Sequence, residues 1–377
     1  MTAPVSFCAA GIVSRKHHPT ATISFRMSGD LVFETWAAEA IARRWAGARI
    51  ERIAALKGDL STRRFWRVWI TSAQEVSAPS TAIVVDLGPD DLPRYVRALN
   101  LLPHPPTEPP WINVHRFLNS LGAPVPALYD LAPERRAMLV EDVGEVSLHS
   151  AALLSEADVA RLFRLATEEL LRLHVDGSLQ IDDRCIARAI AYDGRLFEWE
   201  MKEFKEIGLG VVAPGALLTS IEPELAMLAA RLDRYPRVFS HRDYHGHNLY
   251  LEHGDRIRII DFQDALMAPA AQDLAVLLTT RDTDDLVTPA IERRILDFYH
   301  AGLSRRSAIM LAPNDFITSY RLCVLQHGLK MIGRFEFFER GGKTGYAGFI
   351  SHLLTQARRM LAEMRTEFPQ LCIALGA

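Results

Sequence analysis

Residues 238–251 read Val-Phe-Ser-His-Arg-Asp-Tyr-His-Gly-His-Asn-Leu-Tyr-Leu. Shortly after them, residues 257–264 read Ile-Arg-Ile-Ile-Asp-Phe-Gln-Asp. The first stretch fits the pattern H-R-D-x-x-x-x-N from His241 to Asn248, and the second has Asp261 at the end of an apolar strand. A short motif of this kind arises by chance in roughly a few per cent of chains of this length, and the Asp-Phe pair that follows argues against coincidence.

A β-hairpin is expected between the two motifs. Asp261 follows Asn248 by 13 positions, which leaves room for a strand at 249–252, a turn at 253–255 and a strand at 256–260. Such a hairpin brings the side chains of Asn248 and Asp261 together.

The residue types of the two motifs suit phosphoryl transfer, which requires positioning and charge neutralisation rather than covalent chemistry. Asp243 is a carboxylate that can orient an acceptor hydroxyl, and we count His241 of the same loop with the catalytic residues. Asn248 and Asp261 offer the amide and carboxylate oxygens that Mg²⁺ prefers. The alternative is that these side chains only cap loop backbone.

Three histidines, His241, His245 and His247, alternate along the first motif. Imidazole is a common metal ligand, so a zinc site is an alternative, although alternate residues of an irregular loop need not converge. His245 is a candidate contact for the acceptor or the transferred phosphate, with a solvent-facing loop position as the alternative. We add Asp264 as a second candidate substrate contact.

Length and charge exclude several classes of protein. The chain has 377 residues, with 43 Lys and Arg against 46 Asp and Glu, and a formal net charge of -3, so nothing indicates a nucleic-acid partner. The length suits two domains or one large two-lobed unit, and 49% hydrophobic residues are typical of a globular protein. Lysine occurs at only six positions, and arginine supplies the other basic residues.

The cysteines Cys8, Cys185, Cys323 and Cys372 are far apart and form no C-x-x-C pair, which disfavours a disulfide scaffold. The reducing cytoplasm is therefore the expected compartment. No apolar run approaches the roughly 20 residues of a membrane span, so no membrane partner is expected. Residues 1–29 lack acidic side chains, and we expect a disordered extension or a misplaced start codon, with a transit peptide as the alternative.

The first half reads as a small mixed α+β region. Its expected helices are Asp30–Gly47 with Asp30 as N-cap, a short one near Tyr95–Leu101 within a proline-rich loop, and Trp111–Leu121. Its expected strands are Arg64–Ile70, Thr81–Leu87, Val125–Leu131 and Arg136–Val140.

Beyond Gly144 the pattern is mainly helical. Helices are expected at Glu156–His174, Gly194–Ile207, Ile221–Tyr235, Asp315–Phe338 and Ala347–Phe368. Strands are expected only at Arg237–Ser240, Leu249–Glu252 and Arg256–Ile260. We therefore expect an α+β fold with an extension over 1–29, an N-lobe over 30–143 and a larger helical C-lobe over 144–377.

Six motifs spread between about Asp59 and Leu361 carry a family resemblance. They are 59–68 (DLSTRRFWRV), 138–144 (MLVEDVG), 241–248 (HRDYHGHN), 260–265 (IDFQDA), 273–275 (DLA) and 326–335 (QHGLKMIGRF). With these motifs the chain resembles the aminoglycoside phosphotransferase/choline kinase group of small-molecule kinases, and within it the bacterial N-acetylmuramate/N-acetylglucosamine anomeric kinases of cell-wall recycling. The resemblance implies a protein-kinase-like two-lobed fold, ATP and Mg²⁺ as cofactors, and a small-molecule hydroxyl as acceptor.

Carried over to this sequence, the resemblance implies Asp243 as catalytic base and Asn248 and Asp261 as Mg²⁺ ligands. It also implies a hinge whose backbone meets adenine, made of Glu141, Asp142 and Val143. Residues 59–64 correspond to the loop that covers the phosphates. Because this loop is not glycine-rich, the cradle would rely on Ser61, Thr62, Arg63 and backbone N–H groups, with an exposed hairpin as the alternative.

The sequence departs from the family where a lysine and a glutamate usually pair. The strand Thr81–Leu87 has no lysine, and the helix Trp111–Leu121 has no glutamate. Because guanidinium binds phosphate with a forked donor set, we expect Arg63, Arg64 or Arg67 to supply the missing positive charge.

The acceptor is expected to be small. Only eleven residues separate Asp261 from Asp273, too few for a loop that docks a polypeptide, and no A-P-E follows. Candidate residues of the acceptor pocket are Trp199, Glu200, Tyr320, Gln326, Lys330 and Arg334.

Two alternatives to an amino-sugar kinase stay open at the level of sequence. One is a kinase of aminoglycosides, choline or amino-alcohols. The other is a nucleotide-binding pseudokinase, which the missing lysine favours and the intact Asp243, Asn248 and Asp261 disfavour.

Overall fold

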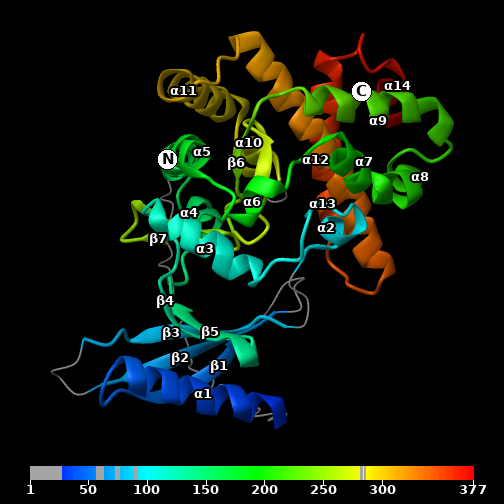
Figure 1. The fold of residues 1–377 in the computed structure, drawn as a ribbon. Coiled ribbons are helices and arrows are strands. Elements are labelled where there is room, and N and C mark those ends of the chain that lie inside the picture. Colours follow the sequence, from blue (N-terminus) through cyan, green and yellow to red (C-terminus); the bar gives the residue numbers. More distant parts are fainter. Residues whose placement is uncertain (1–27, 57–62, 73–76, 89–91, 281–282, 284–285) are drawn as a thin grey trace, which may run out of the picture.

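The computed structural model describes residues 28–56, 63–72, 77–88, 92–280, 283 and 286–377, with side chains from Phe33 onward. Five antiparallel strands form the sheet of the N-lobe in the order β1-β2-β3-β5-β4 (Figure 1). The elements up to residue 141 are α1 (Ser28–Arg44), β1 (Arg49–Leu56), β2 (Arg64–Thr71), β3 (Thr81–Asp86), α2 (Arg94–Ala98), α3 (Pro110–Ser120), β4 (Leu128–Ala132), η1 (Pro133–Arg135) and β5 (Ala137–Glu141), of which α2 and α3 lie against the helical lobe. The expected helix at 30–47 thus begins at Ser28, so Asp30 lies inside it and is not the N-cap.

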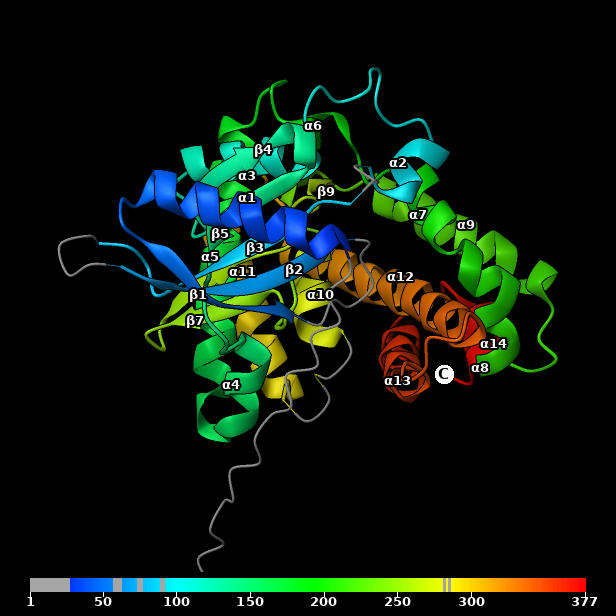
Figure 2. The ribbon, with the colours of Figure 1, turned by 90° about the horizontal axis from the view of Figure 1, so that it is seen from below.

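Helix α1 covers the face of the sheet that points away from the helical lobe (Figure 2). Its buried residues Trp36, Ala40 and Ile41 are spaced at helical intervals and pack against Val68 and Val84. The opposite face of the sheet, through residues such as Val85 and Val140, joins the core of the helical lobe. The sheet is therefore buried beneath α1 and, on its other face, at β3 and β5, whereas β1 has no buried residue.

Strand β1 was not expected, and a β-bulge explains why. Ile50 pairs with Ile70, whereas Arg52 pairs with Trp69, so Glu51 is an extra residue in the ladder. Without the bulge, Ile50 and Ile53 would point to opposite faces, because side chains alternate along a strand. With it, both pack against the cluster beneath α1, and the sequence shows no simple alternation.

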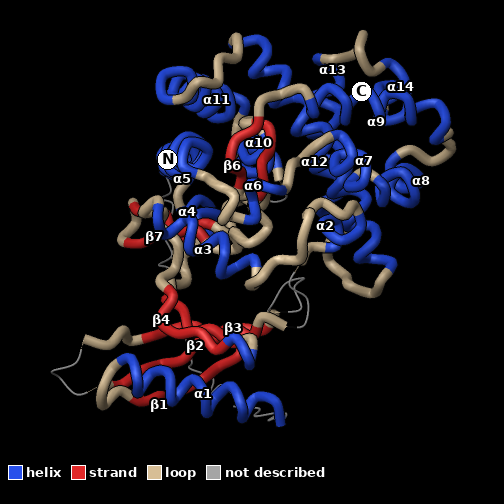
Figure 3. Tube along the Cα trace, viewed as in Figure 1, coloured by secondary structure: helices blue, strands red, loops and turns tan. Residues whose placement is uncertain are grey.

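The C-lobe is mostly helical, with the strand pairs β6–β9 and β7–β8 set among its helices (Figure 3). Its helices are α4 (Leu148–Leu154), η2 (Glu156–Asp158), α5 (Val159–Gln180), α6 (Ile186–Ala189), α7 (Gly194–Glu200), η3 (Phe204–Gly208), α8 (Leu209–Val212), α9 (Leu218–Asp233), α10 (Gln272–Thr279), α11 (Pro289–Arg306), α12 (Pro313–Arg340), α13 (Ala347–Glu363) and α14 (Pro369–Leu375). Its strands are β6 (Arg237–Ser240), β7 (Leu249–Glu252), β8 (Arg256–Ile259) and β9 (Leu266–Pro269). The two-lobed α+β fold expected from the sequence is confirmed.

Three expectations for this lobe were wrong in detail. The helix expected at 194–207 is two elements, α7 and the π-helical turn η3. The helix expected at 347–368 ends at Glu363, and Pro369 begins α14. A fourth strand, β9, pairs with β6 and was missed because four residues ending in proline carry too little periodicity.

The expected hairpin forms between β7 and β8. Leu249 pairs with Ile259, and the N–H of Ile260 donates to the carbonyl of Asn248 at 3.0 Å. This ladder fixes the separation of the two motifs, because Asn248 immediately precedes one strand and Asp261 closely follows the other.

Candidate active site

A buried carboxylate, Asp273 at the start of α10, holds the catalytic loop. Its two oxygens accept the backbone N–H groups of His241 and Arg242, each at 2.8 Å, and one also accepts from His174 Nε2 at 3.0 Å. Burial opposes its charge, but the hydrogen bonds from His174 and His241 keep the pKa of the Asp273 carboxyl below its usual value. Asp273 therefore fixes the backbone of the loop at His241 and Arg242.

Two residues at the site adopt backbone angles that only glycine readily takes. Arg242 has φ 76° and Asp261 has φ 63°, both in the left-handed region. Non-glycine residues are held there at a cost of about 1–3 kcal/mol, and such strain is common at functional sites. The conformation turns Arg242 into the lobe, away from Asp243.

The side chain of Arg242 ends in a buried polar cluster around Glu200. Glu200 is paired with Arg242, accepts a hydrogen bond from Tyr192 and lies 3.1 Å from Lys330 Nζ. Burial raises the pKa of Glu200, but Lys330 and Arg242 outweigh it and hold the pKa at about 2. The guanidinium carbon of Arg242 also lies 4.0 Å from the centre of the Tyr95 ring.

His241, which the motif grouped with the catalytic residues, lies behind the loop. Its Nε2 donates to the carbonyl of Ile260 at 3.0 Å, and only 2% of the residue is exposed. This bond ties the catalytic loop to the backbone just before Asp261. The contacts are those of a residue that positions others.

A cleft of about 740 Å³ lies between the lobes and receives most of the candidate residues. The sequence-predicted residues that line it are Arg63, Glu141, Asp142, Val143, Asp243, His245, Asn248, Asp261 and Asp264. Ser61 and Thr62 fall outside the described residues. The apolar part of the lining includes Phe65 and Ile83 from the sheet and Phe262 from the Asp-Phe pair.

Asn248 and Asp261 form a donor set that fits Mg²⁺. The Asn248 amide nitrogen donates to the main-chain oxygen of Asp243 at 2.9 Å, which leaves its oxygen as the atom presented to a ligand. One oxygen of Asp261 accepts from Arg63 at 2.8 Å and from Gln263 at 3.0 Å, and the side chain is 36% exposed. Mg²⁺ is usually held by one or two carboxylates together with phosphates and water, so a two-residue set suffices.

The three candidate arginines lie in different environments. Arg63 faces Asp261 in the cleft. Arg67 projects from β2 beside Ile83 of β3, and its Nε lies 2.7 Å from Asp142. Arg64 points the other way, pairs with Asp86 at 2.9 Å and lies outside the residues that line the cleft.

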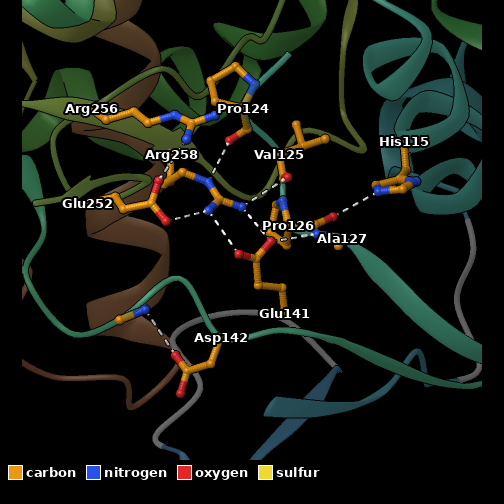
Figure 4. A network of polar contacts seen from close by, with 11 residues as sticks. His115, Pro124, Val125, Pro126, Ala127, Glu141, Asp142, Glu252, Arg256 and Arg258 are labelled. Atoms are coloured by element: carbon orange, nitrogen blue, oxygen red, sulfur yellow. Dashed lines mark hydrogen bonds and ion pairs between the residues drawn. The ribbon is translucent and has the colours of Figure 1, made fainter. Parts of the chain in front are cut away.

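The hinge is tied to the β7–β8 hairpin by one arginine (Figure 4). Arg258 of β8 is 7% exposed and donates to both oxygens of Glu141, to Glu252 at 3.2 Å and to the carbonyl of Val125 at 3.2 Å. The Glu141 carboxylate also accepts the N–H of Ala127 at 2.9 Å. Burial works against its charge, yet Arg258 and this N–H lower the pKa of Glu141. Both oxygens of the Glu141 carboxylate are therefore engaged within the protein.

Asp264 is the carboxylate whose ionisation the site most disfavours. Burial raises its pKa, Arg242 opposes the rise, and Asp243 and Asp261 add to it, so the pKa of Asp264 is about 6. Perturbed carboxyls of this kind are concentrated at functional sites.

The histidines do not form a metal cluster. The rings of His149 and His247 meet at a tilt with centroids 4.3 Å apart, and those of His245 and His247 meet edge to face at 5.8 Å. Within the ranges that the structure describes, no three metal-ligating side chains are grouped to hold a metal ion. The zinc alternative has no support in this geometry.

Sequence reasoning assigned no role to several residues that build the site. Asp273 was quoted only within a motif. Glu200 was expected in the acceptor pocket, but the structure pairs it with Arg242 and it does not line the cleft. Arg258 alternates with Ile257 and Ile259 along β8, so it reads as solvent-facing, yet residues 124–127 cover it. Burial of this second face has no signal in the sequence.

The fold and the cleft define the chain as a phosphotransferase of the two-lobed kinase type. Residues 73–309 match the model of the phosphotransferase enzyme family, and the chain belongs to this family. It is an ATP- and Mg²⁺-dependent kinase with a hydroxyl acceptor. No helix among the described residues is long and apolar enough to cross a bilayer.

The chain is similar to proteins named N-acetylmuramate/N-acetylglucosamine kinase. It is 31% identical to that of Caulobacter vibrioides over 255 residues, which are 63% of this chain and 66% of the relative. It is 29% identical to that of Pseudomonas aeruginosa over 299 residues, 73% of this chain and 83% of the relative. Among solved structures it resembles Plasmodium vivax ethanolamine kinase, with a TM-score of 0.57 at 11% identity over 95% of this chain and 99% of that one. The protein-kinase-like fold expected from the sequence is confirmed.

Proposed function

We propose that the chain transfers the γ-phosphoryl group of ATP to the anomeric hydroxyl of an N-acetylated amino sugar, in the recycling of cell-wall sugars in the cytoplasm. The observation that carries this proposal is the shared name of the curated relatives, N-acetylmuramate/N-acetylglucosamine kinase. The cleft supports it with a carboxylate, Asp243, beside the two proposed Mg²⁺ ligands.

Asp243 is the proposed catalytic base. Its main-chain oxygen accepts from the N–H of His245 at 3.0 Å and from the Asn248 amide at 2.9 Å, which fixes the residue. The carboxylate orients the acceptor hydroxyl and takes its proton as the phosphoryl group is transferred. His245 and Asp264 line the same part of the cleft and are the proposed substrate contacts.

ATP binding is assigned to the cleft walls. The backbone of Asp142 and Val143 meets adenine, and Arg63 and Arg67 supply the positive charge that a lysine supplies elsewhere in the family. Asn248 and Asp261 would hold Mg²⁺, which neutralises charge on the phosphates when bound.

An ADP-release assay with several acceptors tests the acceptor class. We expect turnover with N-acetylglucosamine and N-acetylmuramate, and none with choline or gentamicin. The methyl glycoside of N-acetylglucosamine should not react, because its anomeric oxygen carries a methyl group. Turnover of the methyl glycoside would exclude the anomeric position, and turnover of choline or gentamicin alone would favour the aminoglycoside/choline alternative.

A pair of aspartate variants tests the base. Asp243→Asn should lower kcat by at least about 100-fold, within the range of general-base contributions. Asp255→Asn, in the exposed turn of the hairpin, is the matched control and should keep wild-type turnover. Equal activity of the two variants would contradict the role of Asp243.

A further inference from the structure

The cleft contains a buried histidine that finds no hydrogen-bond partner among the described residues. His327 of α12 is 4% exposed, and neither Nδ1 nor Nε2 makes a hydrogen bond to any residue that the structure describes. An unsatisfied buried polar group costs about 1–3 kcal/mol, so such groups call for an explanation. His327 also lines the cleft together with Asp243. A molecule bound in the cleft could therefore supply the partners that these two buried nitrogens lack.

The surroundings keep His327 neutral. Burial lowers its pKa, Lys330 lowers it further, and Glu200 opposes them only in part, so the pKa of His327 is about 3. A neutral imidazole offers one N–H donor and one nitrogen acceptor. It suits a neutral polar partner.

Apolar side chains follow His327 along one face of α12. Met331 and Phe335 follow it at intervals of four along α12, so the three form one stripe on the helix, and all three line the cleft. Val276 of α10 lines the same cleft. His327, Met331, Phe335 and Val276 form one wall of the cleft. A ligand that fits this wall has an apolar group beside an uncharged group that donates and accepts hydrogen bonds.

We propose that His327 is a specificity residue that binds the acetamido group of the acceptor sugar through one ring nitrogen and a neighbouring sugar hydroxyl through the other. The acetamido methyl then packs against Met331 and Phe335. This assignment rests on the proposed amino-sugar kinase function.

The charge on this wall disfavours a cationic acceptor. Glu200, the carboxylate near His327, is already paired with Lys330 and Arg242, so it is not available to an ammonium group. Helix α12 begins at Pro313, beyond residue 309 where the family match ends. The wall is thus built from a part of the chain outside the family match.

The test compares sugars that differ at one position. We would measure kcat/KM for N-acetylglucosamine, glucosamine and glucose in the wild type and in His327→Leu and His327→Gln, and binding of N-acetylglucosamine by calorimetry without ATP. His327→Leu should reduce the ratio of kcat/KM for N-acetylglucosamine to kcat/KM for glucose by about 10-fold, because one to two neutral hydrogen bonds are lost. Most of the reduction should come from a higher KM for N-acetylglucosamine. His327→Gln, which keeps a donor and an acceptor, should retain part of the ratio. Calorimetry should show the same order of affinities.

A stability measurement separates this role from a structural one. Because His327→Leu removes two unpartnered polar atoms from the interior, its free energy of unfolding should equal or exceed that of the wild type. A less stable variant with equal losses on all three sugars would overturn the proposal, as would an unchanged sugar ratio. If the wild type itself fails to phosphorylate amino sugars, the proposed function fails first and the role of His327 falls with it.

Discussion

The crossing of α12 over η3 depends on the absence of a side chain at Gly333. A Cβ built there would lie 2.2 Å from the backbone nitrogen of Phe204 and 2.5 Å from the carbonyl carbon of Glu203. Both are backbone atoms, so no side-chain rotation can relieve the overlap. We therefore predict that Gly333→Ala strongly destabilises the protein.

The size of the effect follows from these distances. Ordinary contact needs about 3.4 Å or more, so the two helices must separate by about 1 Å. Overpacking in a close-packed core costs about 1–3 kcal/mol, and more where backbone must move. Alanine gains about 1 kcal/mol over glycine in a helix, which offsets part of this cost. The expected net loss is about 2 kcal/mol or more.

Urea unfolding followed by circular dichroism measures this loss. Gly328→Ala is the matched control on the same helix, because its Cβ would make only ordinary contacts, with the nearest atom, the Leu353 carbonyl oxygen, at 3.4 Å. That variant should be as stable as the wild type or slightly more stable. Gly333→Ala should also raise KM for the acceptor, because Met331 and Phe335 flank the crossing. The reasoning is refuted if the two alanine variants are equally stable.

Three further outcomes are expected. Arg63→Ala should raise KM for ATP about 10-fold or more, because it removes a charge-assisted hydrogen bond to the phosphates. Arg64→Ala should leave KM for ATP unchanged. Steady-state kinetics at varied ATP checks both. Glu200→Gln removes a carboxyl whose pKa is about 2 in the folded protein and 4.5 ordinarily. The wild type should therefore exceed the variant in free energy of unfolding by a constant amount above pH 4.5, and this difference should shrink by about 3 kcal/mol as the pH falls toward 2. Urea unfolding at each pH measures the difference. Arg258→Met should lower the free energy of unfolding by about 2 kcal/mol because it leaves Glu141 without its cation, and an unchanged value would show that the tie contributes nothing.

The sequence predicts most of the elements that build the site because their signals are local. The hairpin between Asn248 and Asp261 follows from their spacing and from the alternation of Ile257 and Ile259. Helices α5, α9, α12 and α13 of the C-lobe follow from apolar periodicity over several turns, whereas α4, α10 and α11 were not expected. These features depend on residues close in sequence, so no tertiary information is needed.

Other features depend on contacts between distant residues. Arg258 is buried only because residues 124–127 cover the outer face of its strand. The extra residue Glu51 interrupts the alternation of side chains along β1, so the sequence pattern does not indicate a strand. Nothing near His327 in the sequence reveals that both of its nitrogens lack partners, since that follows from the arrangement of several helices.

The tie between Arg258 and Glu141 has a consequence for how the molecule unfolds. It crosses the junction of the lobes, and the sheet residues Val85, Met138 and Val140 belong to the same core as the helical lobe. Unfolding of the sheet would expose that shared core and leave the buried Arg258 guanidinium without its partner Glu141. The two lobes should therefore melt in a single cooperative transition, while the separate cluster beneath α1 is the part of the molecule able to open on its own.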